Sequence, residues 1–216
     1  MTTHAAPRGF LSRYVFSLDH RVIGIQYLLT AMALAVLGGL LALMVRIQIA
    51  WPDHSFGLVS KLLPGGFEEG VMKPEFYAAL FTMHGTIMVF FVLSAALIGG
   101  FGNFLIPLQV GARDMAFPRL NALSYWIYAV SSVVLLSSFI VPTGPPAAGW
   151  TSYPPLSALK GAIAGSETGQ DLWLVAMALF IVSFTLGGLN FLATIVSLRR
   201  PGLAMLDLPL LSLIHI

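Results

Sequence analysis

Charged residues are absent from four long stretches of the chain, which are instead rich in Leu, Ala, Val, Ile and Phe. These uncharged stretches hold 24, 37, 40 and 27 residues, well over half of the 216. A helix needs about 20 apolar residues to cross the hydrocarbon of a bilayer, so each stretch has room for one crossing. The pattern therefore predicts an all-α integral membrane protein with four transmembrane helices, at about residues 22–45, 76–106, 120–141 and 172–198.

Proline, glycine and polar residues separate the four predicted spans. The second span is expected to end before Pro107 and the third at the sequence PTGPP, because proline cannot continue a helix. Residues 142–170 are too polar and too rich in Pro and Gly to cross the bilayer. No internal repeat is present, and residues 1–210 are expected to form one membrane unit.

The composition sharpens this reading, since 57% of the residues are hydrophobic and only 9% are charged. Such a composition excludes a soluble enzyme, a disordered tail and a nucleic-acid-binding domain. The net charge of +2 is too small to indicate an acidic partner. The chain has no cysteine, which removes disulfides, thiolate zinc sites, iron–sulfur clusters and cysteine nucleophiles. Any metal must be held by His, carboxylate or Met side chains.

The few charges predict an orientation, because basic residues prefer the cytoplasmic side of a membrane. With the N-terminus in the cytoplasm, the inner side has a net charge of +4 and the outer side −2. The first 20 residues lack the features of a signal peptide, so the first span is expected to direct insertion. The inner basic residues are then Arg8, Arg13, Arg21, Arg113, Arg119, Arg199 and Arg200, and the outer ones are Arg46, Lys61, Lys73 and Lys160.

His84 is a polar residue within the second span, about eight residues from its outer end, or roughly 12 Å deep. On a regular helix it shares a face with Tyr77, Met88, Phe91 and Ala95, and such a flat apolar and aromatic face suits a planar cofactor. Two interpretations remain open at this point. His84 is either a neutral histidine bonded to a hydroxyl or carbonyl of a neighbouring helix, or an axial haem ligand.

Hydrogen-bonding residues gather in the cytoplasmic half of the predicted bundle. Ser183, Gly187, Asn190 and Thr194 form one stripe along the fourth span, and Asp114 lies at the mouth of the group. One interpretation is that these residues stabilise helix packing through hydrogen bonds between helices. The alternative is that they order a file of waters that conducts protons. The other members are Gln26, Tyr27, Thr30, Asn103 and Asn121.

Four blocks of this sequence resemble subunit I of the haem-copper terminal oxidases, with the cytochrome c oxidases as the most similar class. The blocks are DHRVIGIQYL at 19–28, HGTIMVFF with GGFGNFLIPLQVGARDMAFPRLN within 84–121, GWTSYPPL at 149–156 and LGGLNFLATI at 186–195. The resemblance covers about residues 10–209. It implies the first four helices, or first third, of a twelve-helix bundle.

The resemblance also implies roles near a haem. His84 stands where the family has an axial ligand of the low-spin haem, haem a in this class, that first accepts electrons. Arg46 stands where the family has an arginine that interacts with a substituent of that haem. Trp150 and Tyr153 correspond to an outer loop near the haem edge, so they are expected to contribute to cofactor binding.

A proton path is implied in the same way. Asp114 corresponds to the cytoplasmic entrance of the family's main path. Phe184 stands where the family commonly has a second serine, so the upper part of the path is expected to differ here. The residues that match positions along the path are Tyr27, Asn103, Asn121, Ser183 and Asn190.

The function implied is that of a bacterial plasma-membrane oxidase that oxidises cytochrome c, reduces oxygen to water and translocates protons. Its implied partners are oxidase subunits II and III, the lipid bilayer and cytochrome c, which donates electrons through subunit II. We expect the high-spin haem and the copper only in a longer subunit, and no catalytic residue or independent activity in this chain. The remaining histidines, at termini, loops or a span edge, are His4, His20, His54 and His215.

Two other functions stay open from the sequence. A quinol oxidase shares these helices and differs mainly in its electron donor, while a channel or assembly protein would use a four-helix bundle without catalysis. The last residues, LSLIHI, depart from the family pattern, so residues 211–216 are expected to be a non-native end.

Overall fold

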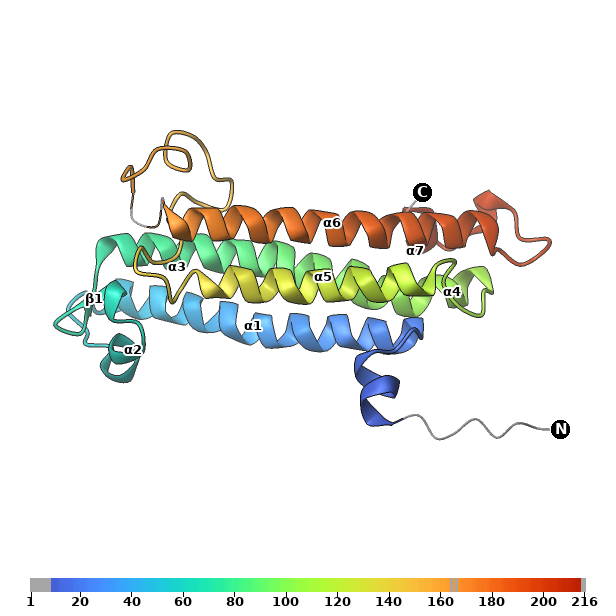
Figure 1. The fold of residues 1–216 in the computed structure, drawn as a ribbon, viewed down its shortest axis with the longest axis horizontal. Helices are drawn as coiled ribbons and strands as arrows, with labels where there is room; N and C mark the ends of the chain where they lie inside the picture. Colours follow the sequence, from blue (N-terminus) through green and yellow to red (C-terminus); the bar gives the residue numbers. More distant parts are fainter. Residues whose placement is uncertain (1–8, 164, 166, 215–216) are drawn as a thin grey trace.

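The computed structural model describes residues 9–163, 165 and 167–214. His4, Arg8 and His215 lie outside the described residues. Four long helical segments lie side by side (Figure 1), and each is long and apolar enough to cross a membrane, which confirms the predicted architecture. The segments are α1 (His20–Ala50), a second composed of α3 (Pro74–Thr86), η3 (Ile87–Gly102) and α4 (Asn103–Val110), then α5 (Pro118–Ser137) and α6 (Thr168–Ser197).

Short elements lie at the two ends of this bundle, called here the Ala50 end and the His20 end after the ends of α1. The Ala50 end is on the left in Figure 1. There β1 and β2 pair antiparallel, with Phe67 opposite Met72. The short elements of the Ala50 end are α2 (Gly57–Leu62), η2 (Pro64–Gly66), β1 (Phe67–Glu68) and β2 (Val71–Met72), and those of the His20 end are η1 (Leu11–Val15), η4 (Met205–Asp207) and α7 (Leu210–Leu213).

The second helical segment continues through Pro107, so the prediction that it ends before this proline is wrong. A proline lacks the N–H that would bond the carbonyl four residues earlier, which here belongs to Asn103. The side chain of His20 supplies the missing donor, because its Nδ1 lies 2.8 Å from the carbonyl oxygen of Asn103. The helix therefore runs to Val110 and ends at Gly111, whose left-handed φ of +76° suits glycine.

The third long helix ends at Ser137, four residues before the predicted boundary. Three successive backbone hydrogen bonds follow that join residues three apart, as in a 3₁₀ turn. They run from Ser138 N to Leu135 O, from Phe139 N to Leu136 O and from Ile140 N to Ser137 O. The hydroxyl of Ser138 also donates to the carbonyl of Leu135, at 2.7 Å. Such bonds satisfy the last carbonyls of the helix as the chain turns away.

The middle of the second segment, η3, is a helix of the wider π type over its 16 residues. Its turns hold more residues than the 3.6 of an α-helix, so side chains beyond Thr86 rotate away from the faces that regular spacing predicts. This change decides which residues stand beside His84.

Aromatic rings fill the centre of the bundle. Tyr128 is fully buried, and its ring stacks on that of Tyr27 with centroids 5.1 Å apart. Its hydroxyl donates to the carbonyl of Phe91 at 2.7 Å. Phe91 in turn lies 5.0 Å from Phe180, again between ring centroids. Rings from all four long segments thus meet in the core. Large apolar side chains cover the outside of the bundle; Leu29 is 67% exposed and Val133 is 68% exposed. Such a surface is expected in lipid or against further helices.

Gly99 allows α1 to approach the second segment closely, because a Cβ there would lie 2.5 Å from the Tyr27 ring. We expect Gly99→Ala to lower the free energy of unfolding in detergent by about 1–3 kcal/mol, as overpacking does elsewhere. The matched control is Gly39→Ala, where a Cβ meets no atom within 4 Å. Equal unfolding midpoints for the two variants would show that Tyr27 does not require this contact.

Candidate functional site

His84 lies on α3 against the backbone of α1. Its Nδ1 is 2.9 Å from the carbonyl oxygen of Gly38. A carbonyl only accepts hydrogen bonds, so Nδ1 carries the hydrogen, and the lone pair of the neutral ring is on Nε2. Glycine at position 38 also leaves room for a neighbour of the histidine, because a Cβ at Gly38 would lie 2.7 Å from the sulfur of Met88. The histidine is half-buried, and no described residue bonds its Nε2.

The predicted face around His84 is correct only in part. Met88 packs beside Gly38 and so stays close to the histidine. Phe91 and Ala95 do not share this face, since both are fully buried in the central aromatic core. The reason is the wide turn of η3, which begins between His84 and these residues. An aromatic side chain reaches the neighbourhood of His84 from another part of the chain instead.

That side chain is Trp150, from the connection between α5 and α6. A Cβ added at Gly85 would lie 3.4 Å from its ring, so the tryptophan covers the residue next to His84. Its ring centroid is also 5.8 Å from that of Phe90. The loop is fixed to α3 by a hydrogen bond from Gly149 N to Thr82 Oγ1, at 3.0 Å.

Arg46 and Tyr153, the other two residues predicted around a haem, lie at the surface. Arg46 follows Gly38 by eight residues on α1, or about 12 Å along the helix towards the Ala50 end. Its side chain is exposed, and no hydrogen bond or ion pair joins it to the residues that the structure describes. Tyr153 is 72% exposed, so it lies away from the packed part of this loop.

A cluster of three hydroxyl groups lies between α1, α5 and α6 in the half of the bundle near the His20 end. The hydroxyl of Tyr27 lies 3.1 Å from Ser124 Oγ and 3.4 Å from Ser183 Oγ. Ser183 Oγ donates to the carbonyl of Ser124 at 2.6 Å. All three residues are buried, so the contacts are shielded from solvent.

Two buried asparagines beside this cluster have polar atoms without a partner among the described residues. Asn121 is fully buried, and neither its amide nitrogen nor its oxygen is bonded. Asn103 donates to the carbonyl of Gly99 at 2.7 Å but leaves its oxygen unbonded. Buried amides are normally satisfied by protein groups or ordered water.

A small cavity of about 10 Å³ lies between Tyr27, Asn103 and Ser183, with Phe184 closing another side. This is close to the space that one water needs, and the site offers several hydrogen-bonding groups. Phe184 stacks on Phe180 with ring centroids 4.2 Å apart, so it belongs to the aromatic core as well. The hydroxyl cluster is therefore bounded by the apolar ring of Phe184.

Asn190 and Thr194 hold the loop that contains Asp114. The Asn190 side chain makes two bonds to the backbone of Phe117: it accepts from the N–H at 2.8 Å and donates to the carbonyl at 3.2 Å. Thr194 Oγ1 accepts from Ala116 N at 2.9 Å. Asp114 is half-buried, and its Oδ1 accepts from Met115 N at 2.7 Å. Both atoms of the Asn190 amide are thus engaged with backbone.

Sequence reasoning did not select Gly38 or Ser124. Ser124 follows Asn121 by three residues on α5, so helical spacing could have indicated it. Gly38 is adjacent to Gly39, and nothing in the sequence shows which of the two glycines meets His84. Contacts of this kind depend on how two helices pack together.

Comparison with known proteins agrees with this architecture. Residues 22–216 match the family described as "Cytochrome C and Quinol oxidase polypeptide I". The chain is 45% identical to the alternative cytochrome c oxidase subunit 1 of Bradyrhizobium diazoefficiens, over 94% of this chain and 32% of the relative. It is 43% identical to the cytochrome c oxidase subunit 1 of Thermostichus vulcanus, over 91% of this chain and 32% of the relative.

A third relative is the heme-copper oxidase subunit I+III of Aeropyrum pernix, 41% identical over 95% of this chain and 23% of the relative. The chain therefore spans about a third or less of the length of these relatives. Together with the four membrane-spanning helices, these matches confirm the resemblance inferred from the sequence blocks. The chain belongs to the cytochrome c and quinol oxidase polypeptide I family.

Proposed function

We propose that this chain forms part of the catalytic subunit of a terminal respiratory oxidase, to which it supplies one axial ligand of a low-spin haem and the entrance of a proton path. The observation that supports this most strongly is the bond between His84 Nδ1 and the Gly38 carbonyl. A histidine that ligates a metal commonly donates its other ring N–H to a carbonyl or carboxylate, which fixes the ring orientation and makes the ligating nitrogen more basic.

The residues around His84 fit a haem better than a bare metal ion. Among the described residues, no three His, Asp or Glu side chains come together as a metal site. A haem needs only an axial ligand from this part of the protein, because the macrocycle supplies the four equatorial nitrogens. Bound there, a haem would accept and pass on single electrons. His84 Nε2 would hold its iron, and the Gly38 carbonyl would keep that nitrogen aimed away from α1.

Three further side chains would serve the same cofactor. Arg46 is an exposed cation on the α1 surface with no partner among the described residues, suited to a polar haem substituent, and it lies in the same half of the bundle as His84. Trp150 covers Gly85 and would exclude water from the edge of the site. Tyr153 is exposed in this chain, so its role would require further helices of a longer subunit to pack on it.

The polar residues near the His20 end would conduct protons from Asp114 into the bundle. Asp114 would take up the proton, and Asn190 and Thr194 would keep its loop against α6. Unbonded atoms of Asn121 and Asn103 would hold ordered waters, and the hydroxyls of Tyr27, Ser124 and Ser183 would continue the hydrogen-bonded file. Asn190 would thus position the loop as well as contribute to the path, since its amide keeps a second N–H and a second lone pair. Phe184 would force the continuation of the file to take another course.

The whole enzyme would oxidise cytochrome c, reduce oxygen to water and translocate protons, in a bacterial plasma membrane with the N-terminus in the cytoplasm. Two of the relatives above are cytochrome c oxidase subunits, which supports cytochrome c as the donor. Subunits II and III, the high-spin haem and the copper would then complete the site beyond this chain. The orientation rests on the charge difference between the two sides.

A quinol oxidase is the second candidate, because the matching family model covers both donors. A non-enzymatic channel or assembly protein is a third, but nothing in the geometry favours it over a haem site. Oxygen uptake by the full-length protein complex with reduced cytochrome c, compared with a quinol, separates the first two.

Reduced-minus-oxidised optical spectra of the full-length gene product test the proposal as a whole. We expect low-spin haem bands, because His84 offers an oriented and unshared Nε2. A channel or assembly bundle would give a featureless difference spectrum at matched protein concentration. Spectra without haem bands, from protein whose helix content is intact, would therefore contradict the proposed function.

A further inference from the structure

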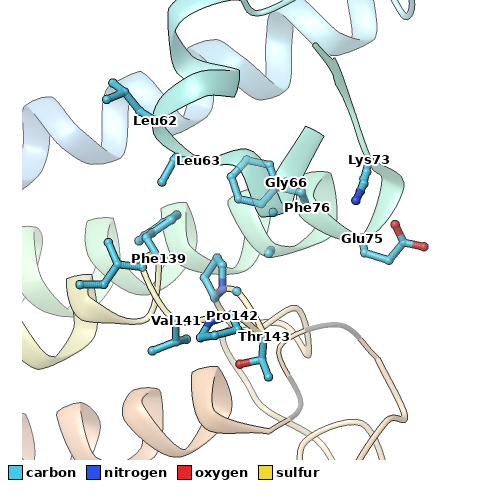
Figure 2. Close-up of a pocket in the computed structure, with 15 residues that line it drawn as sticks. Leu62, Leu63, Gly66, Lys73, Glu75, Phe76, Phe139, Val141, Pro142 and Thr143 are labelled. Carbon is cyan, nitrogen blue, oxygen red and sulfur yellow. The ribbon is translucent and has the colours of Figure 1, made fainter. Parts of the chain in front are cut away.

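A cavity of about 490 Å³ lies at the Ala50 end of the bundle (Figure 2). Its lining includes neither His84 nor the hydroxyl cluster. One wall is the connection around residues 62–66, and the opposite wall is the strap of residues 139–145 that follows α5. Phe76 and Ala79 of α3 lie between these walls. The volume is within the range of about 300–1,000 Å³ found for small-molecule sites.

The cavity is amphipathic along its length. Leu62, Leu63 and Phe139 line one end, whereas Lys73 and Glu75 lie together at the other, as Figure 2 shows. Within the part of the chain that the structure describes, neither the Lys73 ammonium nor the Glu75 carboxylate has a hydrogen bond or ion pair. The mouth therefore presents one cation and one anion that no described residue pairs.

We expect the mouth of the cavity to lie near the depth of lipid headgroups. Helix α3 begins at Pro74, directly between Lys73 and Glu75, and helix α5 ends at Ser137, just before the strap. Both helices belong to candidate membrane spans, and the 20 residues of α5 match the length that crosses the hydrocarbon, so we expect the strap that follows Ser137 to lie near the boundary with water. The apolar part of the cavity then extends beside the spans.

The walls are held in place by bonds of their own. Lys73 N donates to the Gly66 carbonyl at 3.0 Å, and Gly144 N donates to the Val141 carbonyl at 2.9 Å. Thr143 Oγ1 accepts from Gly169 N at 3.3 Å, which ties the strap to the start of α6. A ligand would therefore enter a largely formed site, and little ordering would oppose its binding.

We propose that this cavity binds a phospholipid with an ethanolamine headgroup. One acyl chain lies along the apolar end, the phosphate contacts the Lys73 ammonium, and the lipid's own ammonium contacts the Glu75 carboxylate. A fatty acid would satisfy only Lys73, and an anionic phosphatidylglycerol would leave Glu75 unpaired beside a like charge. The zwitterion is the common lipid chemistry that satisfies both groups at the mouth.

The test uses the full chain in the bacterial membranes in which it is made. A phosphatidylethanolamine with a photoactivatable acyl chain is added, crosslinked by light, and located by peptide mass spectrometry. We expect the label on peptides containing residues 62–66 and 139–145. Lys73→Gln should lower labelling there about tenfold, because one charge-assisted contact is worth roughly a factor of ten. Glu75→Gln should abolish the preference over an equally labelled phosphatidylglycerol probe.

Matched controls are Lys61→Gln and Glu68→Gln, which remove exposed charges of the same loops that do not line the cavity. Labelling in these variants should equal that of the unmodified chain. Label spread evenly over the lipid-facing helix surfaces, equal labelling by the two probes, or equal effects of Lys73→Gln and Lys61→Gln would each overturn the proposal. These readouts need no haem, so they are independent of the proposed oxidase function.

Discussion

Replacing His84 by alanine in the full-length subunit should abolish the low-spin haem bands of the reduced-minus-oxidised spectrum. The imidazole is held by the Gly38 carbonyl at 2.9 Å, and no described residue bonds its Nε2. The other described histidines are His20, at the start of α1, and His54, in the connection after α1. Alanine removes the ligand without introducing a new one, so we expect less than about a tenth of the normal band intensity. His84→Met should keep some absorption at a shifted position, because a thioether can also ligate haem iron.

The matched control is His54→Ala, which removes an exposed histidine in the connection that follows α1. Its spectrum should equal that of the unmodified protein. Gly38→Ala should weaken or broaden the bands without abolishing them, because a Cβ there displaces Met88 and disturbs the bond that orients His84. Full low-spin bands in His84→Ala, at normal helix content, would refute the ligand assignment.

Replacing Asp114 by asparagine should slow proton uptake from the side of the His20 end about a hundredfold, while the haem spectra stay unchanged. A positioned acid that transfers protons contributes a factor of this size, and asparagine keeps the shape but cannot release a proton. The measurement is the rate of proton uptake and pumping by the full-length complex in vesicles. Asp114→Glu should restore much of the rate, since it keeps a carboxyl group.

Asn190→Leu separates proton transfer from positioning. It removes both bonds to Phe117, so the loop should exchange its amide hydrogens faster and uptake should fall less than in Asp114→Asn. Asp207→Asn, which changes an exposed acid of the His20 end, should leave the rate unchanged. If pumping by Asp114→Asn equals that of Asp207→Asn, the proposed path is not used.

The helices were predictable because the cost of burying charge in lipid leaves long uncharged stretches in the sequence. The gathering of polar residues was also predictable from the sequence, since topology alone assigns Tyr27, Asn121 and Ser183 to one half of the bundle. The structure brings Tyr27 and Ser183 within hydrogen-bond distance. The sequence did not predict which side chains contact one another. Regular helical spacing placed Phe91 beside His84, and the wide turn of η3 buries it in the core instead.

Asn190 shows the same limit in another way. Its place on the polar stripe indicated a role in a water file, but did not show that both of its amide atoms bind the backbone of a loop 73 residues earlier. A pattern identifies which residues are polar and which face they share. It does not identify the partner, because that partner comes from a distant segment whose position depends on packing.

The bond between His20 and the Asn103 carbonyl bears on how the protein enters the membrane. The carbonyl freed by Pro107 would be costly to leave unpaired in a bilayer, and its donor lies 83 residues earlier, at the start of α1. Because the chain is synthesised from its N-terminus, α1 is already made when this proline leaves the ribosome. The first two membrane segments are therefore expected to leave the translocon as a paired helical hairpin, in which the first segment supplies the hydrogen-bond donor that the second one lacks.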